Sequence, residues 1–133
     1  MNSRLLLDTH ILLRWHTSSK QLSREQIRAI EKCAVHKEPL AISAVTLIEI
    51  ALLVGDGNLD IAGGMEGFFA HLHQSPLFQI LPITFEIAAG LAYLGMLRDP
   101  FDRTIVATAR VHRLQLVTSD QRIAASKLVP VID

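Results

Sequence analysis

The hydrophobic pattern of the chain alternates between short, wholly apolar runs and longer amphipathic stretches. Four of the runs are too short for helices and lack polar alternation, which is typical of strands buried on both faces of a sheet. These predicted strands cover residues 4–8, 40–42, 79–83 and 114–118. A fifth run, residues 129–132, contains Pro130, which a strand tolerates only where a ladder donor is dispensable, so it is predicted to be an edge strand.

Helical spacing and capping residues separate the predicted strands. Ser23 and Gln26 have the spacing of a capping box, which predicts a helix from Ser23 to about His36. Ser43 is placed to cap a second helix that ends at Gly55. Further helical stretches are predicted at residues 11–15, 65–74, 84–94 and 100–112 and after Asp120. Strands that alternate with helices predict a three-layer α/β/α sandwich with a mostly parallel central sheet of about four to five strands.

Composition and charge indicate one globular domain without a strong electrostatic bias. The 133 residues are 50% hydrophobic and carry 13 basic and 13 acidic side chains, so the formal net charge is +0. This composition excludes a disordered chain, and the length predicts a single domain over residues 1–133. The neutral balance also excludes nucleic-acid binding through a broadly basic surface, so any such contact must be local.

A single cysteine and the short apolar runs indicate the compartment. Cys33 cannot form an internal disulfide, and its place on a helical stretch predicts a core position rather than a nucleophile. The apolar start of the chain is interrupted by Asp8, His10 and Arg14, so a signal peptide is not expected. No apolar run approaches the roughly 20 residues of a membrane-spanning helix. We therefore expect a cytoplasmic protein without a membrane span.

Acidic residues collect where the predicted fold places its ligand site. Right-handed crossovers bring the carboxyl ends of parallel strands to one edge of the sheet, where ligands bind in such folds. Asp8 and Asp120 follow two predicted strands, Glu49 interrupts an apolar helix, and Asp99 and Asp102 flank the start of another helix. Each aspartate could also be structural, as a helix cap or in the field of a helix dipole. Capping does not explain why all of them fall at one edge.

Clustered carboxylates predict a divalent metal site. Like charges raise one another's pKa unless a cation neutralises them, and oxygen ligands suit Mg²⁺ or Mn²⁺. The histidines offer no competing zinc site, because His71 and His73 are two residues apart and fall on different helix faces, while His10 and His16 are six residues apart. A cation held by carboxylates can polarise a phosphoryl oxygen and activate water, so the set fits hydrolysis of a phosphodiester.

Four segments together resemble the motifs of PIN domains: LLLDTH, SAVTLIEIALL, RDPFDRTIVATA and LVTSD. The resemblance covers essentially the whole chain. The length of the chain and its DPFDR segment resemble those of the VapC-type toxins of prokaryotic toxin–antitoxin pairs. It implies a ribonuclease in which four acids are catalytic and bind the metal, and these are Asp8, Glu49, Asp102 and Asp120. Thr118 is the polar residue beside the last acid. Asp102 matches the family's third acidic position better than Asp99 does. Asp99 is then expected either to assist through a water molecule or only to cap the helix.

The resemblance also implies a cofactor and partners. It implies dependence on Mg²⁺ or Mn²⁺, no covalent enzyme intermediate, a homodimer, and a cognate antitoxin that covers or enters the acidic groove. The expected activity is that of an endoribonuclease toxin, which hydrolyses RNA phosphodiester bonds with metal-activated water. Arg14, Arg98 and Arg103 lie near the acids in sequence and are candidates for RNA phosphate contact, or are ordinary surface or ion-paired arginines.

Two other functions are compatible with parts of the pattern. One is a catalytically inactive binding or regulatory module with the same fold. The other is a phosphatase or phosphotransfer domain in which Asp8 is the nucleophile. Haloacid dehalogenase-like enzymes place a second Asp two residues later, where this chain has His10, and a receiver domain needs a lysine after a late strand, where this chain has Thr118 to Asp120. The complete acid set favours the nuclease.

Overall fold

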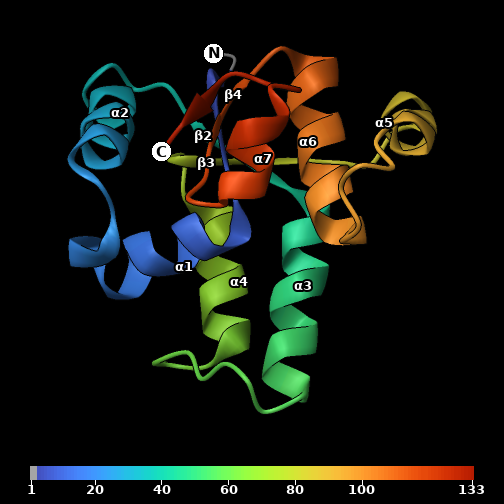
Figure 1. Ribbon diagram of the computed structural model, residues 1–133. Coiled ribbons are helices and arrows are strands. Elements are labelled where there is room, and N and C mark those ends of the chain that lie inside the picture. The colour runs from blue at the N-terminus through green and yellow to red at the C-terminus, as the bar shows by residue number, and fades with distance from the viewer. Residues whose placement is uncertain (1–2) are drawn as a thin grey trace.

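Five short parallel strands form the centre of the fold (Figure 1). The computed structural model describes residues 3–133, and its strand order is β3-β2-β1-β4-β5 with every neighbouring pair parallel. The strands are β1 (Leu5–Leu7), β2 (Leu40–Ser43), β3 (Phe78–Leu81), β4 (Gln115–Val117) and β5 (Val131–Ile132). The parallel sheet is confirmed, and so is the position of the Pro130 segment at its edge.

Helices connect the strands and cover both faces of the sheet. The α-helices of the described residues are α1 (Thr9–Thr17), α2 (Arg24–Val35), α3 (Ala44–Gly55), α4 (Met65–Gln74), α5 (Phe85–Gly90), α6 (Pro100–His112) and α7 (Gln121–Ser126). Short 3-10 turns follow α1 at Ser19–Gln21 and α5 at Leu91–Tyr93. In Figure 1, α2 lies on one side of the strands, and α5 and α6 lie on the other.

Alternating strand residues divide the core into two layers. Leu5 and Leu7 point into one cluster together with side chains of α1 to α4. Leu6, between them, points into the other cluster with residues of α5, α6 and α7. Because successive side chains of a strand face opposite sides, a fully apolar strand requires helices on both faces. The predicted three-layer α/β/α arrangement is confirmed.

Local capping residues set most of the helix boundaries. Ser23 accepts a hydrogen bond from the backbone N–H of Gln26, whose side chain in turn accepts one from the Ser23 N–H, so the predicted capping box is present. Ser43 caps α3, and that helix ends at Gly55 as expected. The predicted helix over residues 84–94 is wrong in its second half, where Leu91–Tyr93 form a 3-10 turn.

Two further expectations concern single features of the chain. Cys33 is buried in the core beside Ile30, and burial, followed by the charge of Glu38, raises the pKa of its thiol. This environment confirms packing rather than nucleophilic chemistry. Across residues 3–133, no helix combines the length and apolar character needed to cross a membrane.

Candidate active site

A pocket of about 320 Å³ brings the predicted acids together at the carboxyl edge of the sheet. Its lining includes five carboxylates, from Asp8, Glu49, Asp99, Asp102 and Asp120. The other lining residues are His10, Arg14, Ser119 and Arg122. A larger surface hollow of about 450 Å³ lies beside α7 and β5, but Asp133 is the one carboxylate in its lining. The concentration of acids, rather than volume, therefore marks the candidate site.

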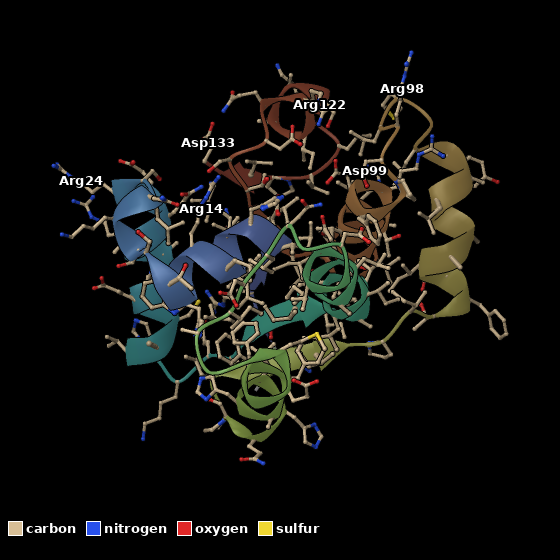
Figure 2. All side chains as sticks on the ribbon, turned by 90° about the horizontal axis from the view of Figure 1, so that it is seen from below. Arg14, Arg24, Arg98, Asp99, Arg122 and Asp133 are labelled. Carbon is tan, nitrogen blue, oxygen red and sulfur yellow. The ribbon has the colours of Figure 1, made fainter. Side chains whose placement is uncertain are left out.

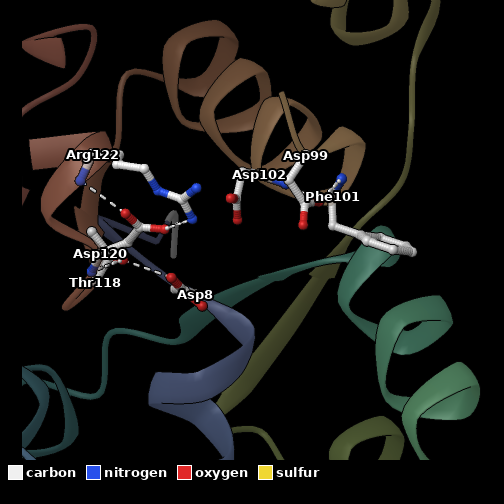
Figure 3. A network of polar contacts seen from close by, with 7 residues as sticks. All are labelled: Asp8, Asp99, Phe101, Asp102, Thr118, Asp120 and Arg122. Atoms are coloured by element: carbon white, nitrogen blue, oxygen red, sulfur yellow. Dashed lines mark hydrogen bonds and ion pairs between the residues drawn. The ribbon is translucent and has the colours of Figure 1, made fainter. Parts of the chain in front are cut away.

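Asp8 leaves the end of β1 and enters the pocket almost fully buried, with 7% exposure. Its Oδ1 accepts the backbone N–H of His10 at 3.0 Å, which caps α1. Its Oδ2 accepts the hydroxyl of Thr118 at 2.6 Å, and the Thr118 oxygen in turn accepts the backbone N–H of Asp120 at 3.1 Å. Figure 3 shows this bridge between the ends of β1 and β4. Thr118 thus links the acidic positions Asp8 and Asp120, a contact that the sequence did not predict.

Asp120 follows β4 and is the N-cap of α7. Its Oδ1 accepts the backbone N–H of Arg122 at 2.9 Å, and its Oδ2 lies 3.4 Å from the Arg122 guanidinium. Burial acts to raise the pKa of this carboxyl, but the hydrogen bonds from the Arg122 side chain and backbone outweigh burial and lower it. Asp120 therefore stays ionised and is both a cap and a member of the acidic set.

Asp99 and Asp102 reach the pocket from the start of α6. Asp99 Oδ1 accepts the backbone N–H groups of Phe101 at 2.8 Å and Asp102 at 3.4 Å, and Pro100 occupies the first turn, so Asp99 is a helix cap that also lines the pocket. In Figure 3 the Asp102 carboxylate extends from α6 into the space beside the Arg122 guanidinium.

Asp102 has the most perturbed carboxyl of the site. Burial is the largest cause, and the charges of the other four acids add to it, so that the pKa rises from 3.8 to about 6. The acids named are Asp99, Asp8, Asp120 and Glu49, in decreasing order of effect. This coupling shows that the five side chains share one electrostatic environment. A cation placed among them would relieve their repulsion.

Glu49 lies on α3 and lines the side of the pocket that this helix forms. One turn earlier, Thr46 forms a buried hydrogen bond of 3.0 Å with Thr9, which fixes α3 against α1. The sequence placed this carboxylate in an apolar helix, where a buried lone charge is unfavourable. The structure resolves that conflict, because Glu49 is only partly buried and opens onto the pocket.

The arginines are distributed differently from the sequence expectation. Arg14 lines the pocket, whereas Arg98 and Arg103 are not part of its lining. Arg103 donates its Nε–H to the Leu97 carbonyl, and Figure 2 shows Arg98 extending away from the protein. Arg122 is a lining residue that sequence reasoning missed. The available signal was its position two residues after a capping Asp, at the start of a helix whose first turn faces the site.

The acidic set fits a hydrated hard cation better than a closed metal cage. Within residues 3–133, no three His, Cys, Asp or Glu side chains are grouped tightly enough to enclose an ion. The donors that face the pocket are carboxylate oxygens, and Mg²⁺ keeps several waters and commonly uses only one or two carboxylates directly. Spaced carboxylates around an open pocket suit this mode of binding.

Comparison with known proteins assigns this arrangement to a family. The chain belongs to the PIN domain family, whose sequence model matches residues 5–127, and the expected resemblance is confirmed. Ribonuclease VapC22 of Mycobacterium tuberculosis is 30% identical over 125 residues, which are 92% of each protein. The structure of FitAcB from Neisseria gonorrhoeae superposes with a TM-score of 0.67 at 27% identity, covering 97% of this chain and 96% of that one. The structure of VapBC2 from Rickettsia felis, bound to a promoter DNA fragment, superposes with a TM-score of 0.71 at 16% identity, covering 99% of this chain and 98% of that one. At this identity the likeness is one of fold.

Proposed function

We propose that this protein is a VapC-type endoribonuclease, the toxin of a toxin–antitoxin pair, and that its activity depends on Mg²⁺ or Mn²⁺. The observation that carries the proposal is the convergence of five carboxylates, from four separate parts of the chain, on one open pocket. Membership of the PIN domain family and 30% identity to a protein named as a ribonuclease support the same activity.

Four of the acids are proposed to hold the metal: Asp8, Glu49, Asp102 and Asp120. When bound there, a divalent cation polarises a phosphoryl oxygen and activates water for hydrolysis. The hydroxyl of Thr118 keeps the Asp8 carboxylate oriented toward the pocket. Asp99 fixes the first turn of α6 through its two N–H contacts, and so fixes the direction of Asp102. The Asp102 carboxyl must lose its proton to act as a ligand, so the metal should bind less tightly as the pH falls below about 6.

The RNA is proposed to cross the mouth of the pocket and to be held by few basic residues. The chain has no net charge, so binding cannot depend on a broadly basic surface. Arg14 is the predicted phosphate contact that lines the pocket. Arg98 is exposed near the start of α6 and can meet the RNA beyond it. Arg103 is engaged by the Leu97 carbonyl and serves this role less well.

An antitoxin and a second copy of the chain are the proposed protein partners. Several large apolar side chains are exposed on α3, at the start of α5 and in the segment after it, namely Ile48, Leu52, Phe85, Tyr93 and Met96. Large exposed apolar side chains are available for contact with another protein, and we infer that these serve the partner interfaces. The antitoxin would then inhibit the enzyme by covering the acidic pocket.

The alternative functions have less support. A phosphatase that uses Asp8 as nucleophile conflicts with membership of the PIN domain family. An inactive binding module would not require a complete set of acids around one pocket. Retention of every acid that the family resemblance implies therefore favours the enzyme.

Cleavage of RNA by the purified protein tests the proposal. Transfer RNA and total cellular RNA are incubated with Mg²⁺, Mn²⁺ or EDTA, and the wild type is compared with Asp8→Asn, Asp102→Asn and the control Asp60→Asn. Asp60 is exposed and lies outside the pocket lining. We expect metal-dependent cuts at discrete positions by wild type and control, and none by the two pocket variants. Equal cleavage by all four proteins, or cleavage in EDTA, would refute the proposal.

A further inference from the structure

Arg122 brings a positive charge into the acidic pocket. It is the second residue of α7 and follows the capping residue Asp120 by two positions. In Figure 3 its side chain extends from α7 over the Asp120 carboxylate toward Asp102. The charges of Asp120, Asp102 and Asp99 all act on this guanidinium. Arg122 therefore occupies part of the space in which a bound cation would neutralise the same acids.

The contact that holds Arg122 there is loose. A single guanidinium nitrogen lies 3.4 Å from Asp120 Oδ2, whereas the Arg122 backbone N–H makes the shorter, 2.9 Å contact that caps α7. The Arg122 side chain is 82% exposed, against 23% for that of Asp120. An exposed ion pair with one long contact contributes little to stability. The backbone N–H of Arg122 makes the capping contact of α7, so the guanidinium can leave Asp120 without disturbing the helix.

We propose that Arg122 is a phosphate-contacting residue, which Asp120 holds over the pocket until a divalent cation and RNA are bound. This inference rests on the proposed ribonuclease function. Asp120 cannot pair fully with both the guanidinium and a divalent cation, and the higher charge of the cation favours its displacing Arg122. The released guanidinium is then beside the site, and its planar fork suits bidentate contact with a phosphodiester.

The position of Arg14 complements this role. Arg14 comes from α1 and Arg122 from α7, and Figure 2 shows them on different elements around the site. Two arginines that line one pocket from separate elements can contact phosphates on the two sides of the bond to be cut. Local phosphate contacts of this kind are what a chain without net positive charge requires.

The matched variants are Arg122→Gln, Arg122→Lys and the control Arg24→Gln. Arg24 is also exposed, also follows a helix-capping residue, and lies on α2, where it points away from the site (Figure 2). Both glutamine variants therefore remove one positive charge from the start of a helix. Thermal unfolding first checks that each variant is folded.

Two readouts separate the proposed role from a structural one. Without RNA, Arg122→Gln should bind Mn²⁺ about threefold more tightly than wild type, since an exposed competing charge is removed. With RNA, its KM should rise, and the slope of log KM against log salt concentration should fall by about 0.7, the value for one phosphate contact to a single strand. Arg122→Lys should restore the slope, because it keeps the charge, but only part of kcat/KM, because it loses the fork.

Several results would overturn the inference. If Arg122→Gln binds Mn²⁺ no more tightly than Arg24→Gln, the guanidinium does not compete with the cation. If its salt slope equals that of wild type, Arg122 does not contact phosphate. If wild type binds Mn²⁺ and cuts RNA but both glutamine variants behave alike, this inference fails while the proposed function stands. If wild type neither binds Mn²⁺ nor cuts RNA, both fail.

Discussion

Replacing Asp102 by Asn should stabilise the folded protein while abolishing the proposed cleavage. Burial, and then the charges of Asp99, Asp8, Asp120 and Glu49, raise the pKa of this carboxyl from 3.8 to about 6. Above that pH the carboxylate is held in an environment that favours its neutral form. Asn has a similar shape without the charge, so the variant removes the repulsion and a proposed metal ligand together.

The size of the effect follows from the pKa shift. A rise of about 2 units corresponds to an upper limit of about 3 kcal/mol in the free energy of unfolding. Asp102 is only half-buried, so solvent screening reduces this to roughly 1.5 kcal/mol. Loss of an acidic residue from the first turn of α6 removes about 0.5 kcal/mol of favourable dipole interaction. The variant should therefore be more stable by about 1 kcal/mol, which raises Tm by roughly 3 °C.

The stabilisation should depend on pH with a defined sign. Between 3.8 and about 6, the native Asp102 carboxyl retains a proton that the unfolded chain has released. The native state then binds more protons than the unfolded state, so the free energy of unfolding of the wild type falls as the pH rises through this range. The stability that Asp102 contributes is thus fully present at low pH and is lost as the carboxyl ionises. The difference between Asp102→Asn and wild type should be near zero at about pH 4 and complete above about pH 7.

Urea unfolding in EDTA across this pH range measures the difference, with Asp60→Asn as the control for loss of one exposed carboxylate. EDTA is required because a bound cation would favour the ionised form of Asp102 and mask the repulsion. The reasoning is refuted if Asp102→Asn is less stable than wild type at neutral pH. It is also refuted if the gap between them is the same at every pH.

Two other substitutions test the structural parts of the site. Thr118→Val should lower the free energy of unfolding by about 2 kcal/mol, because a buried Asp8 oxygen and the Asp120 N–H lose their hydrogen-bond partner. Thr118→Ser keeps the hydroxyl and should stay near wild type. If calorimetry finds the two variants equally stable, the bridge is excluded. Asp99→Asn should change the free energy of unfolding by less than about 0.5 kcal/mol, since Asn also caps helices. This variant should retain the RNA cleavage that Asp102→Asn loses. If both variants lose cleavage equally, Asp99 takes part in the chemistry.

The elements that the sequence predicted best are those defined by local chemistry. Ser23 with Gln26, Ser43, and Pro100 each fix a helix start through contacts within a few residues, and the structure begins the helices there. The third strand ends at Leu81 instead of residue 83, because Pro82 has no N–H to continue the ladder. These boundaries depend on neighbours in sequence, which is why a single chain reveals them.

The acids of the site were also predictable, for a topological reason. Asp8 and Asp120 follow adjacent parallel strands, so their meeting at one edge is a property of the fold. The direction of long side chains was not predictable. Arg103 turns back to the Leu97 carbonyl, while Arg122 turns into the pocket, and neither outcome can be inferred from spacing because both depend on tertiary contacts.

Joint titration of metal binding and RNA cleavage tests the central claim most directly. Mn²⁺ bound to the wild type is measured by electron paramagnetic resonance over the same concentrations at which the rate of RNA cleavage is measured. The account predicts that bound Mn²⁺ and cleavage rate rise together, and that Asp102→Asn reduces both while Asp60→Asn changes neither. Full cleavage before any Mn²⁺ is bound, or binding that Asp102→Asn leaves unchanged, would contradict the assignment of the acidic pocket as the metal-dependent nuclease centre.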